Sequence, residues 1–137
     1  MKYGVLLDAR ESRAKVLRCP DDAKILQTCY DVIGCRLIEN MILEPGRLPE
    51  GYAAFADEDL YEKLQVFNLL ASWIHGADVH GQTICNNVII WKEIPEDVDF
   101  MTEEEARKIC NDLNALDAKE IFIKMVDTVF EKTNSRP

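Results

Sequence analysis

Short apolar runs separated by polar turns dominate the first two thirds of the chain, and β-favouring residues are frequent in them. Residues 3–7 form one such run, and residues 14–20 form a second run that Pro20 ends. Later runs of the same character lie at residues 35–43, 52–60 and 82–93, and the one at 52–60 continues into an acidic turn. A loop rich in proline and glycine, residues 44–51, lies between two of them. These patterns predict short β-strands.

Two segments between the strands carry apolar residues at helical spacing instead. In residues 21–34, Asp21 or Asp22 is expected to cap the first turn, and Gly34 to end the helix. The inward face of this helix is expected to contain Ile25, Leu26, Cys29, Val32 and Ile33. Residues 60–76 predict a second helix that ends at Gly76 and buries Leu64, Phe67, Leu70, Ala71 and Ile74.

From Pro95 onward the pattern changes to longer helices. Thr102 and Glu105 have the spacing of a capping box, in which each side chain caps the backbone amide of the other. The helix that follows is expected to bury Ala106, Ile109, Cys110 and Leu113. Residues 117–132 carry a wider apolar stripe that needs cover from the same chain or from a second copy, and its members are Ile121, Phe122, Met125, Val126, Val129 and Phe130.

The order of these elements predicts an α+β fold. We expect a small antiparallel or mixed sheet with helices on one face, followed by two C-terminal helices. The length of 137 residues fits one domain over residues 1–137. Within it, residues 1–95 would contain the sheet and two helices, and residues 96–137 the C-terminal helical part.

Residues 26–93 resemble a family of small phage and mobile-element proteins, the domain of unknown function 3846. The resemblance lies in "DVIGCRLIE", "YAAFADEDL", "NLLASWI" and "GQTICNNVIIWKE", in this order along the chain. It covers about half of the chain and leaves the helices from Thr102 onward outside. It implies an accessory protein of a mobile element, and proteins of that setting often block a host defence enzyme or sequester its nucleotide signal.

The charge balance bears on the class of partner. Against 25 acidic residues stand 16 lysines and arginines, so the formal net charge is −9. Such a field repels phosphate backbones, so the chain is not expected to bind nucleic acid. It contains no signal peptide and no run of about eighteen apolar residues, and its five cysteines form no CxxC pair. We therefore expect a cytoplasmic protein with free thiols and no contact with membranes.

Metal and thiol chemistry have one candidate segment. His75 and His80 lie near Asp78 and Cys85, but the spacing places them on a loop and supplies too few ligands for a structural zinc site. A helix-ending loop is favoured over a metal site, and no catalytic residue or cofactor is expected. Cys85 with either histidine is the one plausible nucleophile and base. "HGADVHG" lacks the lysine and hydroxyl of a phosphate-binding loop.

Two acidic clusters and two tryptophans complete the list of candidate binding residues. Asp57, Glu58 and Asp59 could hold a divalent cation, although a solvated turn is favoured. The second cluster comprises Glu93, Glu96, Asp97, Asp99 and Glu103 to Glu105, and with the first it could mimic DNA towards a basic protein. Trp73 is a candidate for stacking or anchoring, whereas Trp91 is expected in the core.

These observations favour a non-enzymatic binding protein of a phage or mobile element, such as a counter-defence inhibitor of a host protein. The alternative is a module that binds a nucleotide or another small metabolite, followed by an acidic DNA mimic and by an enzyme without a recognised motif. Candidate ligand or partner contacts are Trp73, His75, His80, Asp57, Glu58 and Asp59. A homodimer is also considered because of the stripe at residues 117–132.

Overall fold

An antiparallel sheet organises the chain, of which the computed structural model describes residues 1–58 and 65–134. The strands follow the order β2-β1-β5-β4-β3, and β6 pairs with the end of β5. Within the described residues the strands are β1 Lys2–Asp8, β2 Arg13–Cys19, β3 Ile38–Asn40, β4 Tyr52–Asp57, β5 Val88–Ile94 and β6 Asp97–Asp99. The predicted α+β fold with an antiparallel sheet and two C-terminal helices is confirmed.

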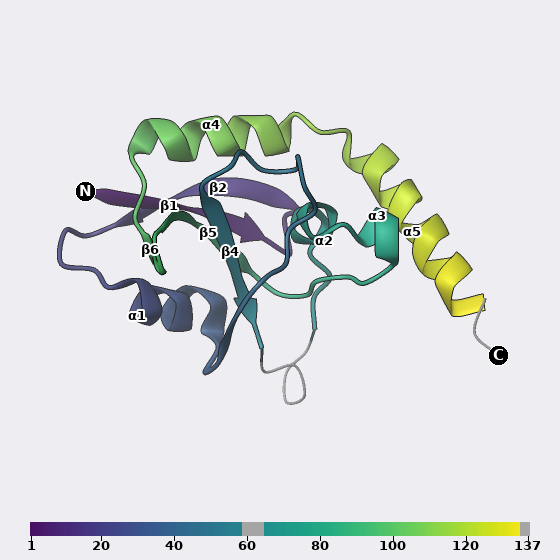
Figure 1. Ribbon diagram of the computed structural model, residues 1–137, viewed down its shortest axis with the longest axis horizontal. Helices are drawn as coiled ribbons and strands as arrows, with labels where there is room; N and C mark the ends of the chain where they lie inside the picture. The colour runs from purple at the N-terminus through teal and green to yellow at the C-terminus, as the bar shows by residue number, and fades with distance from the viewer. Residues whose placement is uncertain (59–64, 135–137) are drawn as a thin grey trace.

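Helical segments lie on both sides of this sheet. In Figure 1, α4 runs above the sheet, α1 lies below it, and α5 stands beside α3 at one end of the molecule. The helical segments are α1 Ile25–Cys29, the π-helical turn η1 Tyr30–Gly34, α2 Leu69–His75, α3 Ala77–His80, α4 Glu103–Asn114 and α5 Ala118–Asn134. The expected single helical face therefore holds for α2, α4 and α5, whereas α1 and η1 cover part of the other face.

Alternating side chains of the strands build two cores. Val5 and Leu7 of β1 point to the face that α2 and α4 cover, together with Val88 and Ile90 of β5. Ile89 and Trp91 point to the opposite face, against Cys29 and Ile33. This two-residue period is the usual consequence of the pleat. Both faces of β5 are buried over residues 88–91, which matches the continuous apolar run in this half of the strand.

A close contact between β1 and β5 explains one glycine. A Cβ atom at Gly4 would lie 2.6 Å from Cζ3 of Trp91. The indole is fully buried, donates from Nε1 to Sγ of Cys29 at 3.4 Å, and meets the ring of Phe100 edge to face. The prediction that Trp91 packs in the core is confirmed.

The first helix begins later than its sequence suggests. It starts at Ile25, and Lys24 at its N-cap makes no side-chain capping bond in the described structure. The predicted cap by Asp21 or Asp22 is therefore wrong, and Asp21 instead pairs with the N-terminal amine at 2.6 Å. Gly34 has a φ of +75°, which is the left-handed conformation expected where a helix ends.

The second helix is shorter than predicted at its N-terminal end. Asn68 is its N-cap and accepts from the backbone N–H of Ala71. Phe67 lies outside the helix, in an isolated β-bridge with Cys85, so its predicted helical position is wrong. The inward position predicted for Leu64 lies outside the described residues. An asparagine favours an N-cap because its short side chain competes for backbone N–H groups, and α2 accordingly begins at Leu69.

In the C-terminal part, the predictions for α4 are confirmed, whereas the segments before and after it differ from the predictions. The capping box of Thr102 and Glu105 is present, and the four residues expected inside are buried. However, β6 precedes α4 where only helices were expected. In α5, Ile121 and Met125 are buried, whereas other members of the stripe are exposed, namely Phe122, Val126 and Phe130. Of the two kinds of cover expected for the stripe, the same chain therefore supplies it for Ile121 and Met125 but not for these three.

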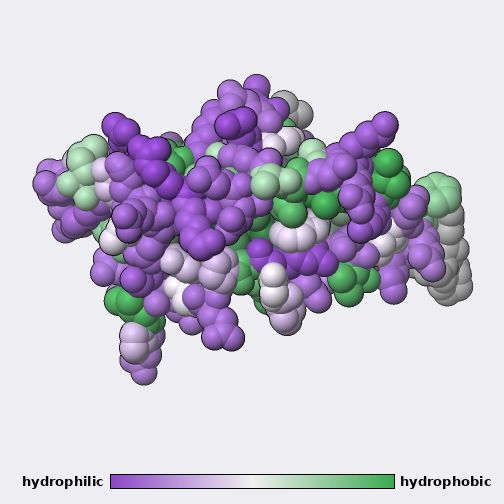
Figure 2. Space-filling model, turned by 90° about the horizontal axis from the view of Figure 1, so that it is seen from above, coloured by the Kyte–Doolittle hydropathy of each residue, from purple (hydrophilic) through white to green (hydrophobic). Residues whose placement is uncertain are grey.

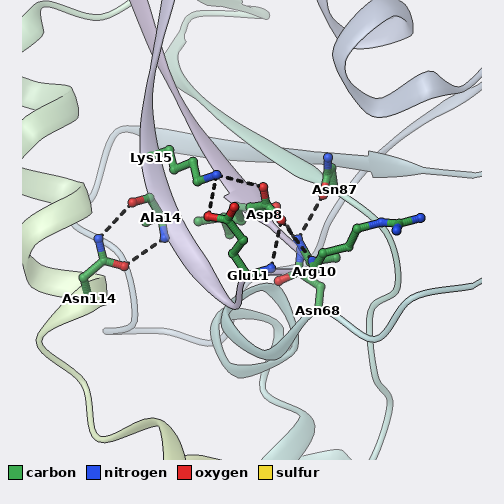
Figure 3. A network of polar contacts seen from close by, with 10 residues as sticks. Asp8, Arg10, Glu11, Ala14, Lys15, Asn68, Asn87 and Asn114 are labelled. Carbon is green, nitrogen blue, oxygen red and sulfur yellow. Dashed lines mark hydrogen bonds and ion pairs between the residues drawn. The ribbon is translucent and has the colours of Figure 1, made fainter.

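A polar network fixes the turn between β1 and β2 (Figure 3). Asp8 accepts from the backbone N–H groups of Arg10 and Glu11, each at 3.0 Å, and from Nζ of Lys15 at 3.1 Å. These contacts, above all the bond from the Glu11 amide, lower the pKa of Asp8. Asn114 of α4 reaches the same hairpin and bonds the backbone of Ala14. The hairpin is therefore fixed to α4 through side-chain contacts.

Candidate functional site

The candidate residues from the sequence do not converge on one site. Trp73, His75 and His80 lie around the junction of α2 and α3. Asp57 ends β4 and is only 3% exposed, so the expected solvated turn is wrong at this residue. Glu58 is exposed directly after it, and Asp59 lies outside the described residues. The described candidates therefore lie in two separate regions.

Trp73 is partly covered by a salt bridge. The guanidinium of Arg47 lies 4.4 Å from the centre of the Trp73 ring and donates to the Trp73 carbonyl at 2.8 Å. It also makes a two-pronged ion pair with Asp78, at 2.8 and 3.0 Å, and this pair lowers the pKa of Asp78. Arg47 thus occupies one ring face of Trp73 and fixes the 44–51 loop to the helices. A stacking role for Trp73 would be limited to its other face.

The two histidines serve the helix junction. Their rings meet edge to face at 4.7 Å. His75 Nδ1 lies 2.6 Å from the carbonyl oxygen of Ile42, and His80 Nε2 lies 2.9 Å from the carbonyl oxygen of His75. The backbone N–H of Gln82 donates to Nδ1 of His80 at 3.0 Å. Both nitrogens of His80 are therefore engaged by the backbone. The predicted loop position is wrong, because His75 is the last residue of α2 and His80 the last residue of α3.

Cys85 is poorly placed to act as a nucleophile. Burial raises the pKa of its thiol, whereas a nucleophilic cysteine needs a lowered one. It forms a β-bridge with Phe67. All five cysteines carry free thiols. Among the described residues, no three histidine, cysteine or acidic side chains are grouped so that they could hold a metal ion.

A small polar pocket adjoins Asp57. Its volume is about 190 Å³, and its lining includes Asp57, Arg10, Asn86 and Asn87. Asn86 has a φ of +69°, and its Oδ1 accepts from the backbone N–H of Val66 at 3.0 Å. Its Nδ2 is buried and has no hydrogen-bond partner among the described residues. This pocket therefore combines Asp57 with the polar side chains of Arg10, Asn86 and Asn87.

The larger candidate site is a groove on the sheet face that α1 covers only in part. We call it the acidic groove, and its volume is about 510 Å³. Its apolar wall contains Ile38 of β3 and Ala53 and Phe55 of β4, which share one face of these strands. Leu26 of α1 and Ile94 of β5 stand at its sides and are 57% and 37% exposed. Because α1 and η1 are short, this end of the sheet keeps apolar surface open.

Acidic side chains of the β5–β6 hairpin line the same groove. They are Glu93, Glu96 and Asp97. All three are exposed, and none makes an ion pair within the part of the chain that the structure describes. The groove thus combines an apolar wall with exposed acidic side chains.

The hairpin turn holds one of these acids in an unusual conformation. Pro95 and Glu96 connect β5 to β6, and Glu96 has a φ of +60°. Proline followed by a residue with positive φ is typical of a type II turn, where glycine is usual at the second position. A glutamate there costs conformational energy, and such costs are often found at functional positions. The sequence indicated the acidic cluster but not its apolar wall, because the wall residues lie about forty to seventy positions earlier.

Comparisons with known proteins found no matching family model, no similar curated protein and no similar solved structure. In the described part of the chain, no helix has the length and apolar character needed to cross a membrane.

Proposed function

We propose that this protein is a non-enzymatic binding protein, and that its acidic groove holds a basic, partly apolar segment of another protein. The observation that carries the proposal is the combination of Leu26, Phe55 and Ile94 with three exposed acidic side chains in one groove. An apolar contact supplies affinity by removing surface from water. The carboxylates select a basic partner and reject acidic ones.

The charge of the whole chain supports the same class of partner. A net charge of −9 accelerates the approach of basic proteins, and a groove lined by one sign of charge concentrates that field. Single exposed ion pairs contribute little, so the three acids would act mainly through selectivity and association rate. The groove acids are exposed to water, where a partner can reach them. These features support binding more than catalysis.

The resemblance of residues 26–93 to a mobile-element family narrows the proposed partner to a host protein. Host defence enzymes that act on nucleic acid carry basic surfaces, because they must contact phosphates. An acidic groove would compete with nucleic acid for such a surface. The DNA-mimic alternative is one form of this competition. Since Asp57 is buried, it would not contribute to the mimic, which would depend mainly on the second acidic cluster.

A peptide-binding experiment tests the acidic groove directly. The probe is a fluorescent peptide of alternating lysine and leucine, compared with one of glutamate and leucine, and the readout is fluorescence anisotropy. The groove variant carries Glu93→Gln, Glu96→Gln and Asp97→Asn. The control variant carries Asp22→Asn, Glu39→Gln and Glu50→Gln, which are exposed positions outside the groove and change the net charge equally.

We expect the groove variant to bind the basic peptide about tenfold more weakly, with a smaller salt dependence. The control variant should lose less than about twofold. Equal losses in both variants would mean that only the overall charge attracts the peptide, and the proposal would be wrong. Failure of the unmodified protein to distinguish the two peptides would also contradict it.

The strained turn at Glu96 allows a second test, in which stability is expected to rise while peptide binding weakens. Glu96→Gly should stabilise the protein by about 0.5–1 kcal/mol, because glycine adopts positive φ without a steric penalty. The same variant should bind the basic peptide more weakly. Greater stability together with unchanged binding would mean that Glu96 does not contribute to the proposed binding site.

The polar pocket favours a second candidate function, namely binding of a small polar molecule. Its lining combines Asp57 with the polar side chains of Arg10, Asn86 and Asn87, which would bind polar groups of the ligand. At about 190 Å³ the pocket is smaller than the roughly 300–1,000 Å³ usual for drug-sized ligands, so a nucleotide does not fit. Thermal-shift assays with small carboxylates and amino acids test this. A ligand-induced thermal shift that is unchanged in the Asn86→Ala variant would mean that the ligand does not bind in this pocket.

A further inference from the structure

Four large apolar side chains of α5 face solvent. They are Phe122, Ile123, Val126 and Phe130, which are 47%, 49%, 46% and 67% exposed. In Figure 2, hydrophobic residues interrupt the mostly hydrophilic surface towards the end of the molecule where α5 lies. Contiguous apolar surface of this kind marks an interaction site more often than scattered single residues do.

The exposed face is distinct from the one that packs within the chain. Ile121 and Met125 belong to the main core, and Thr128 donates to the carbonyl oxygen of Asp78 at 2.7 Å. These contacts hold α5 against α3 and position its other face outward. The helix is therefore already anchored, and its outer apolar stripe is left for another molecule.

A groove runs along this outer stripe. It has a volume of about 310 Å³, and Phe67 and Thr83 form its wall opposite α5. The ring of Phe67 meets that of Phe122 edge to face, with the centroids 6.2 Å apart. An aromatic side chain of another molecule has the size and chemistry to fill this groove.

The charges of α5 identify the kind of partner. Lys119, Lys124 and Lys132 balance Glu120, Asp127 and Glu131, so that the helix is neutral. The rest of the chain therefore carries the whole net charge of −9. Two copies of this protein repel each other over most of their surfaces, but α5 allows them to approach without that cost. Neutral charge and an apolar face together favour a second copy over a strongly charged partner.

We propose that α5 is a homodimer interface in which two copies pack antiparallel about a two-fold axis at Val126. A two-fold interface uses the same patch on both copies, so Val126 would meet its own counterpart. Phe122 and Phe130 each lie four residues, about 6 Å, from Val126 along the helix. Antiparallel packing would therefore place Phe130 of the second copy beside Phe122 and the groove.

The size of the patch predicts a weak dimer. A fully buried aromatic side chain covers roughly 150–250 Å². The four half-exposed side chains therefore offer roughly 400–500 Å² per copy, near the lower limit of about 1,000 Å² in total for a specific interface. We expect a dissociation constant on the order of micromolar. The proposal does not rest on the acidic groove, which shares no lining residue with the α5 groove.

Analytical ultracentrifugation between about 1 and 500 µM tests the interface in the range that its size predicts. The unmodified protein should change from monomer to dimer over this range. Val126→Glu should remain monomeric, because two carboxylates would meet at the axis. Ile42→Glu is the matched control, since Ile42 is an exposed aliphatic residue outside α5, and it should dimerise normally. Circular dichroism confirms that each variant is folded.

A mixing experiment tests the two-fold register. Val126→Glu and Val126→Lys should each be monomeric alone, and an equal mixture should form a heterodimer because opposite charges then meet. A monomeric unmodified protein at all concentrations would overturn the proposal. So would a dimer that Val126→Glu leaves intact, or a mixture that stays monomeric while both variants are folded.

Discussion

Asn114 binds the backbone of Ala14 with both ends of its side-chain amide. Its Oδ1 accepts from the Ala14 N–H, and its Nδ2 donates to the Ala14 carbonyl oxygen, each at 2.8 Å (Figure 3). Ala14 lies on β2, which in the described sheet has a partner strand on one side only. The amide therefore takes the place that a neighbouring strand would have at this sheet edge, which limits unwanted strand pairing there.

Asn114→Ala should lower the free energy of unfolding by about 1–3 kcal/mol, because two partly buried backbone groups lose their partner. Urea denaturation monitored by circular dichroism measures this change. Asn111→Ala is the control, since Asn111 is an exposed asparagine of the same helix. Equal losses in the two variants would mean that helix propensity, and not the contact with Ala14, determines the effect.

The second prediction concerns Tyr52 and Glu105. The Tyr52 hydroxyl donates to Oε2 of Glu105 at 2.6 Å, and this bond is the main cause that lowers the pKa of Glu105 to about 2. Burial, and then the bond to Glu105, raise the pKa of Tyr52 to about 12. A lowered carboxyl pKa stabilises the fold above its unfolded value of 4.5, and this contribution is lost as the pH falls towards 2. The raised tyrosine pKa stabilises below 10 and is lost as the pH rises through 12.

Tyr52→Phe should therefore lower the unfolding free energy at pH 7 by about 1 kcal/mol. The difference from the unmodified protein should shrink as the pH falls from 4.5 towards 2. An NMR titration of the Glu105 carboxyl should show its pKa rising in the variant. Tyr30→Phe, at a tyrosine of η1, should change neither quantity. A Glu105 titration that is unaffected by Tyr52→Phe would disprove the assignment.

The third prediction concerns Asn68, which is fully buried and connects three backbone segments. Its Oδ1 caps α2 at Ala71, and its Nδ2 donates to the carbonyl oxygens of Leu7 and Asn86 at 3.0 and 2.9 Å. Asn68→Asp keeps the cap but places a buried negative charge against two carbonyl oxygens. We expect a loss of about 3–5 kcal/mol at neutral pH.

Burial and the two carbonyl oxygens should raise the pKa of the new carboxyl in the folded protein. The stability loss should therefore diminish as the pH falls from about 7 to 5, because the protonated group can donate a hydrogen bond again. Denaturation at several pH values measures this. Asn68→Ala should show no such recovery, and an equal pH dependence in both variants would contradict the explanation.

Periodicity sufficed for much of the fold. The apolar run around Ile89 predicted β5, and Thr102 with Glu105 predicted the start of α4, because both signals are local. The start of α2 was missed because a helical pattern continued through Phe67, whereas Asn68 gains more from its tertiary bonds to Leu7 and Asn86. Propensity alone does not contain such long-range contacts.

The candidate site was less accessible from the sequence. The three groove acids belong to an acidic cluster that the sequence indicates. Phe55 and Leu26 lie beside them only because β4 pairs with β5 and α1 is short. The exposure of Phe122 and Phe130 was missed for a related reason. Helical periodicity identifies an apolar stripe, but it does not tell whether the stripe is wider than the surface that covers it.

The contact between Gly4 and Trp91 also has a consequence for finding relatives of this chain. A Cβ atom at position 4 would lie too close to the indole, so a larger residue there requires the indole to move or to be replaced, and we expect the two positions to change together. A related chain with alanine or serine at position 4 should carry a smaller residue at position 91. This coupled pair, combined with the Asn68 position, provides a structural signature by which distant members of the lineage can be recognised when overall similarity has been lost.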